Sequence, residues 1–168
     1  MNPESEHPLP GLSRAAAVRV LLVEDFVAFR QFICLRLWNS HCLRLRNSPD
    51  LRVIGEASDG LEALQKAVEL RPDLILLDLG LPSLNGIEVA RHMRRLVPES
   101  KIIFLTRETS AETVQEALSV GAWGYVTKSK AQADLFAAVE AVLSGKTFIS
   151  NLSATPNFNF PPETQFRH

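Results

Sequence analysis

Five short apolar runs alternate with helical segments along this chain, and this alternation restricts the fold more than any other feature. The runs cover residues 18–23, 51–56, 74–77, 101–105 and 123–126, and they are rich in residues that favour β-strands. Strands that alternate with helices form a parallel sheet covered on both faces, with right-handed crossovers. The sequence therefore predicts one doubly wound α/β domain over about residues 18–149.

The segments between these runs carry helix start and stop signals. Asp59, Asn85 and Ser110 stand at N-cap positions before expected helices over 60–70, 86–96 and 111–120. Ser129, with Gln132 three residues later, resembles a capping box for a last helix over 130–144. Gly121 and Gly145 are expected to end the last two helices. The first helix is expected to follow Asp25 and to end near residues 38–40.

Composition excludes several classes of protein. The 168 residues suit one domain, and 46% hydrophobic with 22% charged residues is ordinary for a soluble globule. A net charge of −1 gives no general attraction to nucleic acid, and the arginine clusters at 91–95 and 36–52 suit solvated surfaces. No run approaches the roughly 20 residues of a membrane span, and no signal peptide is recognisable. We expect a cytoplasmic protein that binds neither nucleic acid nor membranes, with Cys34 and Cys42 as free thiols.

The ends of the chain and one internal duplication show no periodic pattern. Residues 1–17 are expected to be a disordered leader and 150–168 a disordered tail. Residues 34–40 and 42–48 match at six of seven positions, which indicates an eight-residue duplication. A second copy cannot continue the apolar stripe of a helix, because eight residues turn it by about 80° beyond two full turns. We expect an insertion at the edge of the sheet opposite the carboxyl ends of the strands.

Chemically useful side chains follow four of the predicted strands. They are Glu24 and Asp25, Asp78, Thr106, and Lys128. Ligands of open α/β sheets bind outside the carboxyl ends of the strands, where these side chains should meet. Clustered carboxylates need a cation, and oxygen ligands favour Mg²⁺. Each residue alone is more often a cap or turn residue, but the set indicates an Asp78 nucleophile for phosphoryl groups, with Lys128 and Thr106 as stabilising partners.

The same residues resemble the CheY-like receiver domain of two-component response regulators. The resemblance rests on VRVLLVED at 18–25, PDLILLDLGLPSLNGIE at 72–88, KIIFLT at 101–106 and GAWGYVTK at 121–128. It implies a flavodoxin-like (βα)5 domain with a five-stranded sheet of order 2-1-3-4-5. It makes Asp78 the phosphoacceptor. For the other positions it implies Mg²⁺ or Mn²⁺ ligands at Glu24, Asp25, Asp78 and the Gly80 carbonyl, phosphoryl contacts from Thr106 and Lys128, and a switch aromatic at Tyr125.

The resemblance also implies partners. DGLEAL at 59–64 and SGKTFIS at 144–150 look most like receivers that precede LuxR/NarL-type helix-turn-helix domains. The last 18 residues of this sequence are too few to form such a domain. We therefore expect a stand-alone receiver that takes a phosphoryl group from a histidine kinase or phosphotransfer protein and passes the signal to an output protein. A homodimer through the fourth helix, fifth strand and fifth helix is a further expectation. Catalysis would extend only to its own phosphorylation and dephosphorylation.

Three features depart from the family pattern: Arg107, Ser129 and the duplication at 34–48. Arg107 follows Thr106 where the family usually has a small residue, so it is a candidate modulator of the phosphoryl chemistry. It also favours an alternative, an interaction module that keeps the fold without being phosphorylated. Ser129 replaces a frequent proline. A phosphohydrolase would need an acid two residues after Asp78, where the chain has Gly80.

Overall fold

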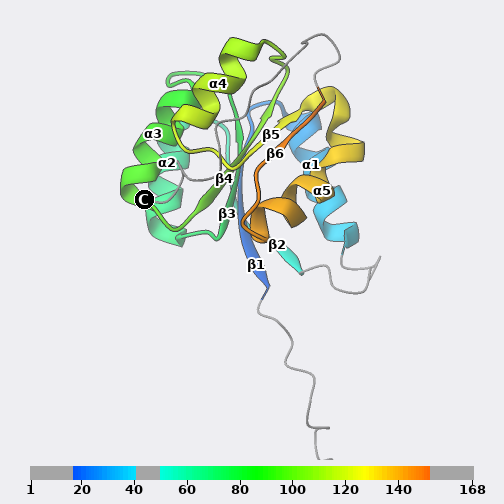
Figure 1. Cartoon of the computed structure of the whole chain (residues 1–168). Helices are drawn as coiled ribbons and strands as arrows, with labels where there is room; N and C mark the ends of the chain where they lie inside the picture. The colour runs from blue at the N-terminus through cyan, green and yellow to red at the C-terminus, as the bar shows by residue number, and fades with distance from the viewer. Residues whose placement is uncertain (1–16, 41–49, 152–168) are drawn as a thin grey trace, which may run out of the picture.

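The computed structural model describes residues 17–40 and 50–151, which form a central sheet between two layers of helices (Figure 1). The strands are β1 (Val18–Val23), β2 (Leu51–Ala57), β3 (Leu74–Asp78), β4 (Lys101–Thr106), β5 (Gly124–Thr127) and β6 (Phe148–Ile149). The helices are α1 (Val27–Ser40), α2 (Gly60–Leu70), α3 (Gly86–Leu96), α4 (Ala111–Ser119) and α5 (Ala131–Leu143). In these two stretches, no helix combines the length and apolar character needed to cross a bilayer.

The strands are all parallel and lie in the order β2-β1-β3-β4-β5-β6. The first five follow the predicted order, but the prediction of a five-stranded sheet is wrong by one strand. β6 adds to the edge of β5, where the Ser150 amide donates to the Tyr125 carbonyl at 2.8 Å. Two residues are too few to show strand periodicity, so this pairing depends on the free edge of β5 and not on a sequence pattern.

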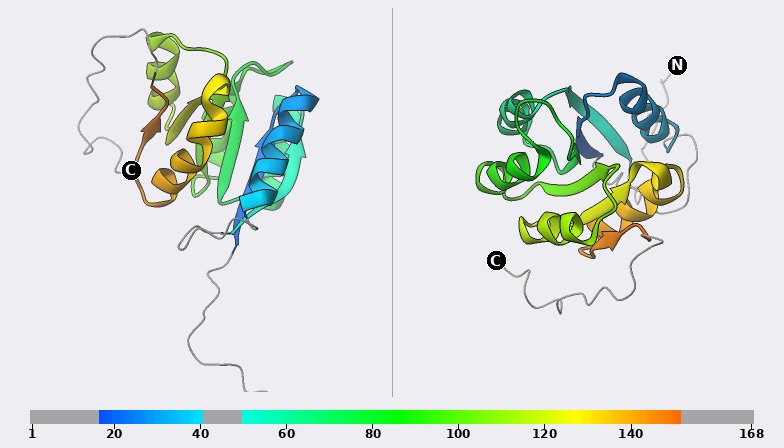
Figure 2. Two further views of the ribbon diagram at one scale, coloured as in Figure 1. Left: turned by 90° about the vertical axis from the view of Figure 1, so that its right-hand side faces the viewer. Right: turned by 90° about the horizontal axis from the view of Figure 1, so that it is seen from above.

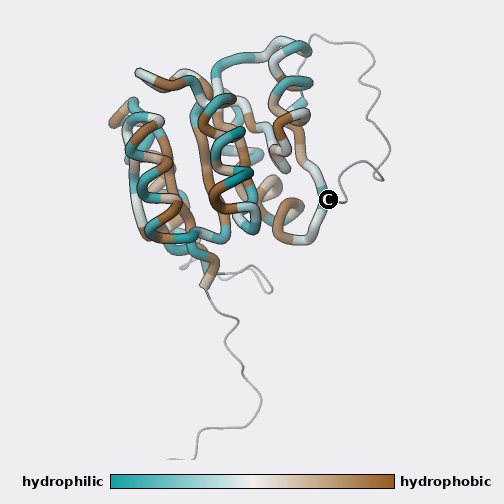
Figure 3. The backbone as a smooth tube through the Cα atoms, turned by 90° about the vertical axis from the view of Figure 1, so that its left-hand side faces the viewer, coloured by the Kyte–Doolittle hydropathy of each residue, from teal (hydrophilic) through white to brown (hydrophobic). Residues whose placement is uncertain are grey.

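Helices cover both faces of the sheet, as the alternation of strands and helices predicts. α1 and α5 pack on one face, and α2, α3 and α4 pack on the other (Figure 2). Figure 3 shows the second group from outside, where hydrophilic and hydrophobic segments alternate along each helix. This banding is expected of helices with one face in the core and the other in water.

β3 lies in the interior of the sheet, which explains why its first four residues are apolar. All five of its residues are buried, because β1 and β4 pair with its edges and helices cover both of its faces. The strand includes Asp78 as its last residue, so a buried scaffold holds the carboxylate at the carboxyl edge.

The predicted N-caps of α2, α3 and α4 are confirmed. Asp59, Asn85 and Ser110 each accept a hydrogen bond from the main-chain amide of the third residue of their helix.

The start of α5 differs from the prediction. Ser129 is not the N-cap; a 3₁₀ helix over Lys128–Lys130 comes first, and α5 begins at Ala131 without a side-chain cap. The Ser129 hydroxyl contacts that of Thr127 at 3.5 Å instead. The 3₁₀ helix turns the chain directly at Lys128, and this displaces the helix start by one residue.

Several sequence predictions fall on residues outside the described part. These are the leader up to residue 16, the second copy of the duplication with Cys42, and the tail from residue 152. The first copy is the second half of α1, which ends at Ser40 as expected, and Cys34 is a free thiol. Ser150, which the sequence assigns to the tail, is buried: its hydroxyl donates to Asp134 at 2.7 Å and accepts the Thr127 amide at 3.2 Å.

Candidate phosphoacceptor site

Three carboxylates meet at the carboxyl edge of the sheet. Glu24 and Asp25 follow β1, and Asp78 ends the neighbouring strand β3. One oxygen from each of the three lies within 4.8 Å of the others. Glu24 and Asp78 are only 1% and 4% exposed, whereas Asp25 is exposed. The structure therefore brings together the three acidic residues that the sequence proposes as a cation site, with one of them open to solvent.

Lys128 joins this cluster from the turn after β5. Its ammonium lies 2.8 Å from Glu24 Oε2 and 3.1 Å from Asp78 Oδ2, and its side chain is 10% exposed. The ring centre of Phe29 in α1 lies 4.8 Å from the same ammonium. The single positive charge is shared by two buried carboxylates, so the described cluster keeps an excess of negative charge.

The electrostatics of Glu24 show that this cluster suits a cation. Burial raises the pKa of the Glu24 carboxyl above its ordinary value, and the charge of Asp78 raises it further, against the lowering effect of the Lys128 hydrogen bond. Both oxygens of the buried Glu24 carboxylate face the Lys128 ammonium, whose nitrogen lies 2.9 Å from Oε1 and 2.8 Å from Oε2. Three clustered carboxylates that share one ammonium fit a hard divalent cation such as Mg²⁺.

The loop after β3 shapes the other side of Asp78. The Gly80 amide donates to Asp78 Oδ1 at 3.1 Å, while Oδ2 of the same carboxylate accepts from Lys128. Both oxygens therefore have donors in the protein. The role of the Gly80 carbonyl as a metal ligand stays a prediction, because only its amide makes a described contact.

Thr106 and Tyr125 are connected through the main chain of Glu108. The Glu108 amide donates to the Thr106 hydroxyl at 3.0 Å. The Tyr125 hydroxyl donates to the Glu108 carbonyl at 2.8 Å, and the side chain is fully buried. A displacement of the Thr106 hydroxyl would therefore remove the acceptor of the Glu108 amide and disturb the residue that holds Tyr125.

Titration of Tyr125 gives a direct measurement of this buried state. Burial raises the pKa of its hydroxyl to about 12 from the ordinary 10.0, and the Glu108 carboxylate adds to the rise. The neutral phenol thus contributes stability below pH 10, and this is lost as pH rises through about 12. Tyr125 is the only tyrosine, so tyrosinate absorbance should rise with a midpoint near 12 in the folded protein. In denaturant the midpoint should fall to 10; a folded chain that also titrates at 10 would contradict the described burial.

Sequence reasoning missed three side chains around the cluster. Arg30 donates to the Glu24 carbonyl at 2.9 Å and pairs with Glu56 at 3.4 Å, so it anchors the main chain of the acidic pair. Phe29 lies against Lys128, and Phe26 lies against Arg107. All three belong to the chain just after Asp25. Their position within five residues of the acidic pair was the available signal, but a helix pattern does not show which side chains turn toward the site.

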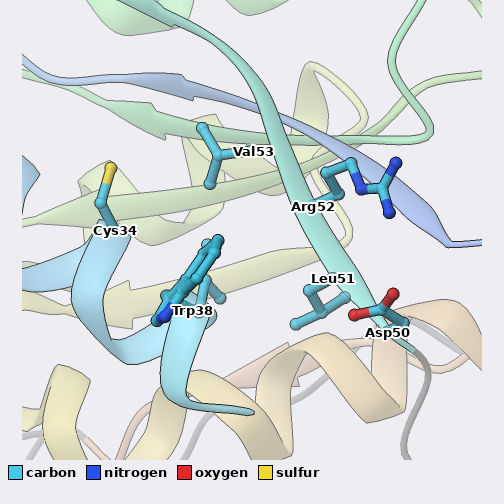
Figure 4. A pocket seen from close by; sticks show the side chains of 7 residues that line it. Cys34, Trp38, Asp50, Leu51, Arg52 and Val53 are labelled. Atoms are coloured by element: carbon cyan, nitrogen blue, oxygen red, sulfur yellow. The ribbon is translucent and has the colours of Figure 1, made fainter. Parts of the chain in front are cut away.

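A hollow lies between α1 and β2, at the edge of the sheet opposite the carboxyl ends of the strands (Figure 4). It is lined mainly by the second half of α1 and by residues 50–53, and its volume is about 320 Å³. Leu51 in its wall pairs with Val18 at the start of β1, so the hollow is remote from the carboxyl ends of the strands. Burial raises the pKa of the Cys34 thiol in its wall to about 11, which keeps it protonated at neutral pH. The hollow takes no part in chemistry at Asp78.

Comparison with known proteins identifies the class to which this fold and cluster belong. The family model of the response regulator receiver domain matches residues 20–140. The chain therefore belongs to the response regulator receiver domain family, whose members are signalling modules of two-component systems.

Three known proteins illustrate this relationship. The transcriptional regulatory protein LiaR of Bacillus subtilis is 36% identical over 129 residues, which cover 77% of this chain and 57% of LiaR. A protein-glutamate methylesterase/protein-glutamine glutaminase of Thermotoga maritima is 41% identical over 113 residues, 66% of this chain and 30% of that protein. A LuxR-family two-component response regulator from Aurantimonas superposes with a TM-score of 0.69 at 33% identity, over 80% of this chain and 91% of its own. This chain spans little more than half the length of LiaR.

Proposed function

We propose that this chain is a phosphorylation-gated switch that accepts a phosphoryl group on Asp78 from a histidine kinase or a phosphotransfer protein. The observation that carries the proposal is the buried Asp78 carboxylate beside Glu24 and Asp25, with the Lys128 ammonium 3.1 Å away. A carboxylate nucleophile needs nearby positive charge when a phosphoryl group arrives, and this arrangement supplies it. The membership of the receiver family supports the same chemistry.

The transfer is a single displacement at phosphorus. An oxygen of the Asp78 carboxylate attacks the phosphorus of a phosphohistidine, and the bond between phosphorus and the imidazole nitrogen breaks. The imidazole keeps the electron pair, and Asp78 becomes an acyl phosphate. Glu24, Asp25, Asp78 and the Gly80 carbonyl would hold Mg²⁺, which when bound supplies positive charge to the phosphoryl oxygens. Lys128 would exchange its Asp78 carboxylate oxygen for a phosphoryl oxygen.

The switch follows from the contacts of Thr106. Its hydroxyl would turn toward the phosphoryl oxygens and leave the Glu108 amide without its acceptor. The Glu108 main chain would then move together with the Tyr125 hydroxyl that it binds. The surface of α4, β5 and α5 would change, and we propose that it binds an output protein or a second copy of the chain in the phosphorylated state. Protein–protein binding is the proposed output of this chain.

The test is phosphorylation by acetyl phosphate in the presence of Mg²⁺, read by intact mass and by a phosphate-affinity gel. Wild-type protein is expected to gain one phosphoryl group, and Asp78→Asn none. A chelator of divalent cations should prevent the gain in the wild type. Equal phosphorylation of both proteins would overturn the assignment of Asp78. A wild type that stays unmodified with acetyl phosphate and with a phosphorylated histidine donor would favour an interaction module without phosphorylation.

A further inference from the structure

Two side chains meet across the carboxyl end of β3. The sheet order places β3 between β1 and β4. Phe26 comes three residues after the end of β1, and Arg107 directly follows β4. The guanidinium carbon of Arg107 lies 5.7 Å from the ring centre of Phe26. β3 lies between β1 and β4, so a contact between the segments that follow β1 and β4 crosses the carboxyl end of β3. Asp78 is the last residue of β3.

The bridge lies on the solvent side of the site. Phe26 is 52% exposed and Arg107 is exposed, whereas Asp78 at the end of β3 is 4% exposed. The Phe26 amide donates to Glu24 Oε1 at 3.1 Å, which ties the aromatic residue to the acidic cluster. A guanidinium over an aromatic ring is attracted by the charge distribution of the ring. This attraction restrains the long, flexible side chain of Arg107 against the half-exposed ring of Phe26.

We propose that Phe26 and Arg107 form a gate over Asp78, defined by this cation–π pair, which sets how fast water and small phosphodonors reach the carboxylate. The inference rests on the proposed function, because it assumes that Asp78 carries the phosphoryl group. It assigns control of access to a pair of residues outside the acidic cluster and Lys128. It also gives a role to the arginine that replaces the usual small residue of the family.

The gate acts on two reactions that start from solvent. In hydrolysis, a water oxygen attacks the phosphorus of the acyl phosphate and the bond from phosphorus to the Asp78 oxygen breaks. The carboxylate keeps the electron pair, and inorganic phosphate leaves with the water oxygen while the proton passes to solvent. In phosphorylation by acetyl phosphate, the Asp78 oxygen attacks the phosphorus and acetate leaves. In this proposal, water and acetyl phosphate both pass between Phe26 and Arg107 on their way to Asp78.

The two possible roles of Arg107 predict opposite results, so they can be separated. A guanidinium that only attracts anions would speed phosphorylation by the anionic acetyl phosphate, and its removal would slow that reaction. A guanidinium that closes a gate with Phe26 slows it, and its removal would speed both phosphorylation and hydrolysis. Replacing Phe26 should have the same effect as replacing Arg107 only in the second case, because Phe26 carries no charge.

The experiment compares Arg107→Ala, Phe26→Leu and the double variant with the wild type. Leucine keeps apolar bulk but removes the ring. The control is Arg95→Ala, which removes the same charge from an exposed position in the last turn of α3. Two rates are measured by intact mass: loss of the phosphoryl group after the donor is removed, and its gain from acetyl phosphate. Mg²⁺ is saturating throughout.

Each single variant is expected to accelerate both rates by about two- to fivefold, the factor that an exposed cation–π pair supports. The double variant should match the faster single variant, since either substitution alone opens the gate. Arg95→Ala should behave like the wild type. The gate is overturned if both single variants keep wild-type rates, if their effects multiply in the double variant, or if Arg107→Ala slows phosphorylation. A wild type that is never phosphorylated on Asp78 overturns the proposed function and the gate together, whereas a phosphorylated wild type with unchanged variants overturns the gate alone.

Discussion

The Lys128→Met variant is expected to have a free energy of unfolding about 3 kcal/mol below that of the wild type at neutral pH, without divalent cations. The physical reason is the burial of the carboxylates that Lys128 neutralises, since Glu24 and Asp78 are 1% and 4% exposed. Removal of one partner from a buried ion pair leaves a desolvated charge without compensation. Here it leaves two, with Asp25 as a third negative charge nearby. Urea denaturation followed by circular dichroism gives the measurement.

Acid and Mg²⁺ should each reduce this deficit. The folded pKa of Glu24 is already raised above its ordinary value of 4.5, so its protonated form stabilises the fold below that pH. That contribution is lost as pH rises through the raised value, and without Lys128 the loss is larger. The difference between variant and wild type should therefore shrink as pH falls toward 4.5. The proposed Mg²⁺ would bind only the folded cluster and should stabilise the variant more than the wild type, because no ammonium competes with it.

The matched control is Lys146→Met. Lys146 is exposed after the end of α5, and the only contact described for it is its main-chain amide with the Ala141 carbonyl. Its substitution removes the same charge and should change stability by less than about 0.5 kcal/mol. A Lys128→Met variant as stable as this control would show that Glu24 and Asp78 are not held as a buried charged pair. An unchanged response to Mg²⁺ would show that the cation does not bind beside Lys128.

The strands and the positions of the acidic residues were predictable because β3 has a strong local signal. Residues buried on both faces must be apolar, and an ionisable residue at the end of such a run marks the edge of the sheet. The caps Asp59 and Asn85 were predictable for a similar reason, since a short polar side chain before an apolar helix pattern satisfies the first free amides. Once the edges of the strands are known, parallel topology alone places Glu24, Asp78 and Lys128 near one another.

The remaining features depend on contacts between parts of the chain that are distant in sequence. β6 forms because the edge of β5 offers main-chain donors and acceptors. A strand of two residues has no sequence pattern that would predict this pairing. Ser129 does not cap α5 for a similar reason. The chain forms a 3₁₀ helix over Lys128–Lys130, and this overrides the tendency of a serine to cap a helix. The bridge between Phe26 and Arg107 joins residues 81 positions apart. Only the order of the strands makes them neighbours.

The Gly86→Ala substitution tests how the loop after β3 holds Asp78 in place. A Cβ at Gly86 would lie 2.3 Å from the Asp78 carbonyl oxygen and 2.7 Å from the Leu79 Cα. Both are main-chain atoms, so no side-chain rotation can relieve the contact. The Gly86 amide also donates to the Leu79 carbonyl at 2.9 Å, which fixes the start of α3 against the end of β3. Either α3 or the end of β3 has to move to accommodate the methyl group.

We expect Gly86→Ala to lower the free energy of unfolding by about 3 kcal/mol, at the upper end of the usual effect of overpacking. The proposed phosphorylation of Asp78 should slow on the order of 10- to 100-fold, because the nucleophile shifts relative to Lys128 and the other carboxylates. Gly80→Ala is the matched control for stability in the same loop, since a Cβ there would meet only Asp78 Oδ1, at 3.9 Å. Urea denaturation and acetyl phosphate labelling measure the two effects. If Gly86→Ala is as stable as Gly80→Ala, the loop has room for a methyl group at Gly86. The close packing of α3 against the end of β3 would then not fix the position of Asp78.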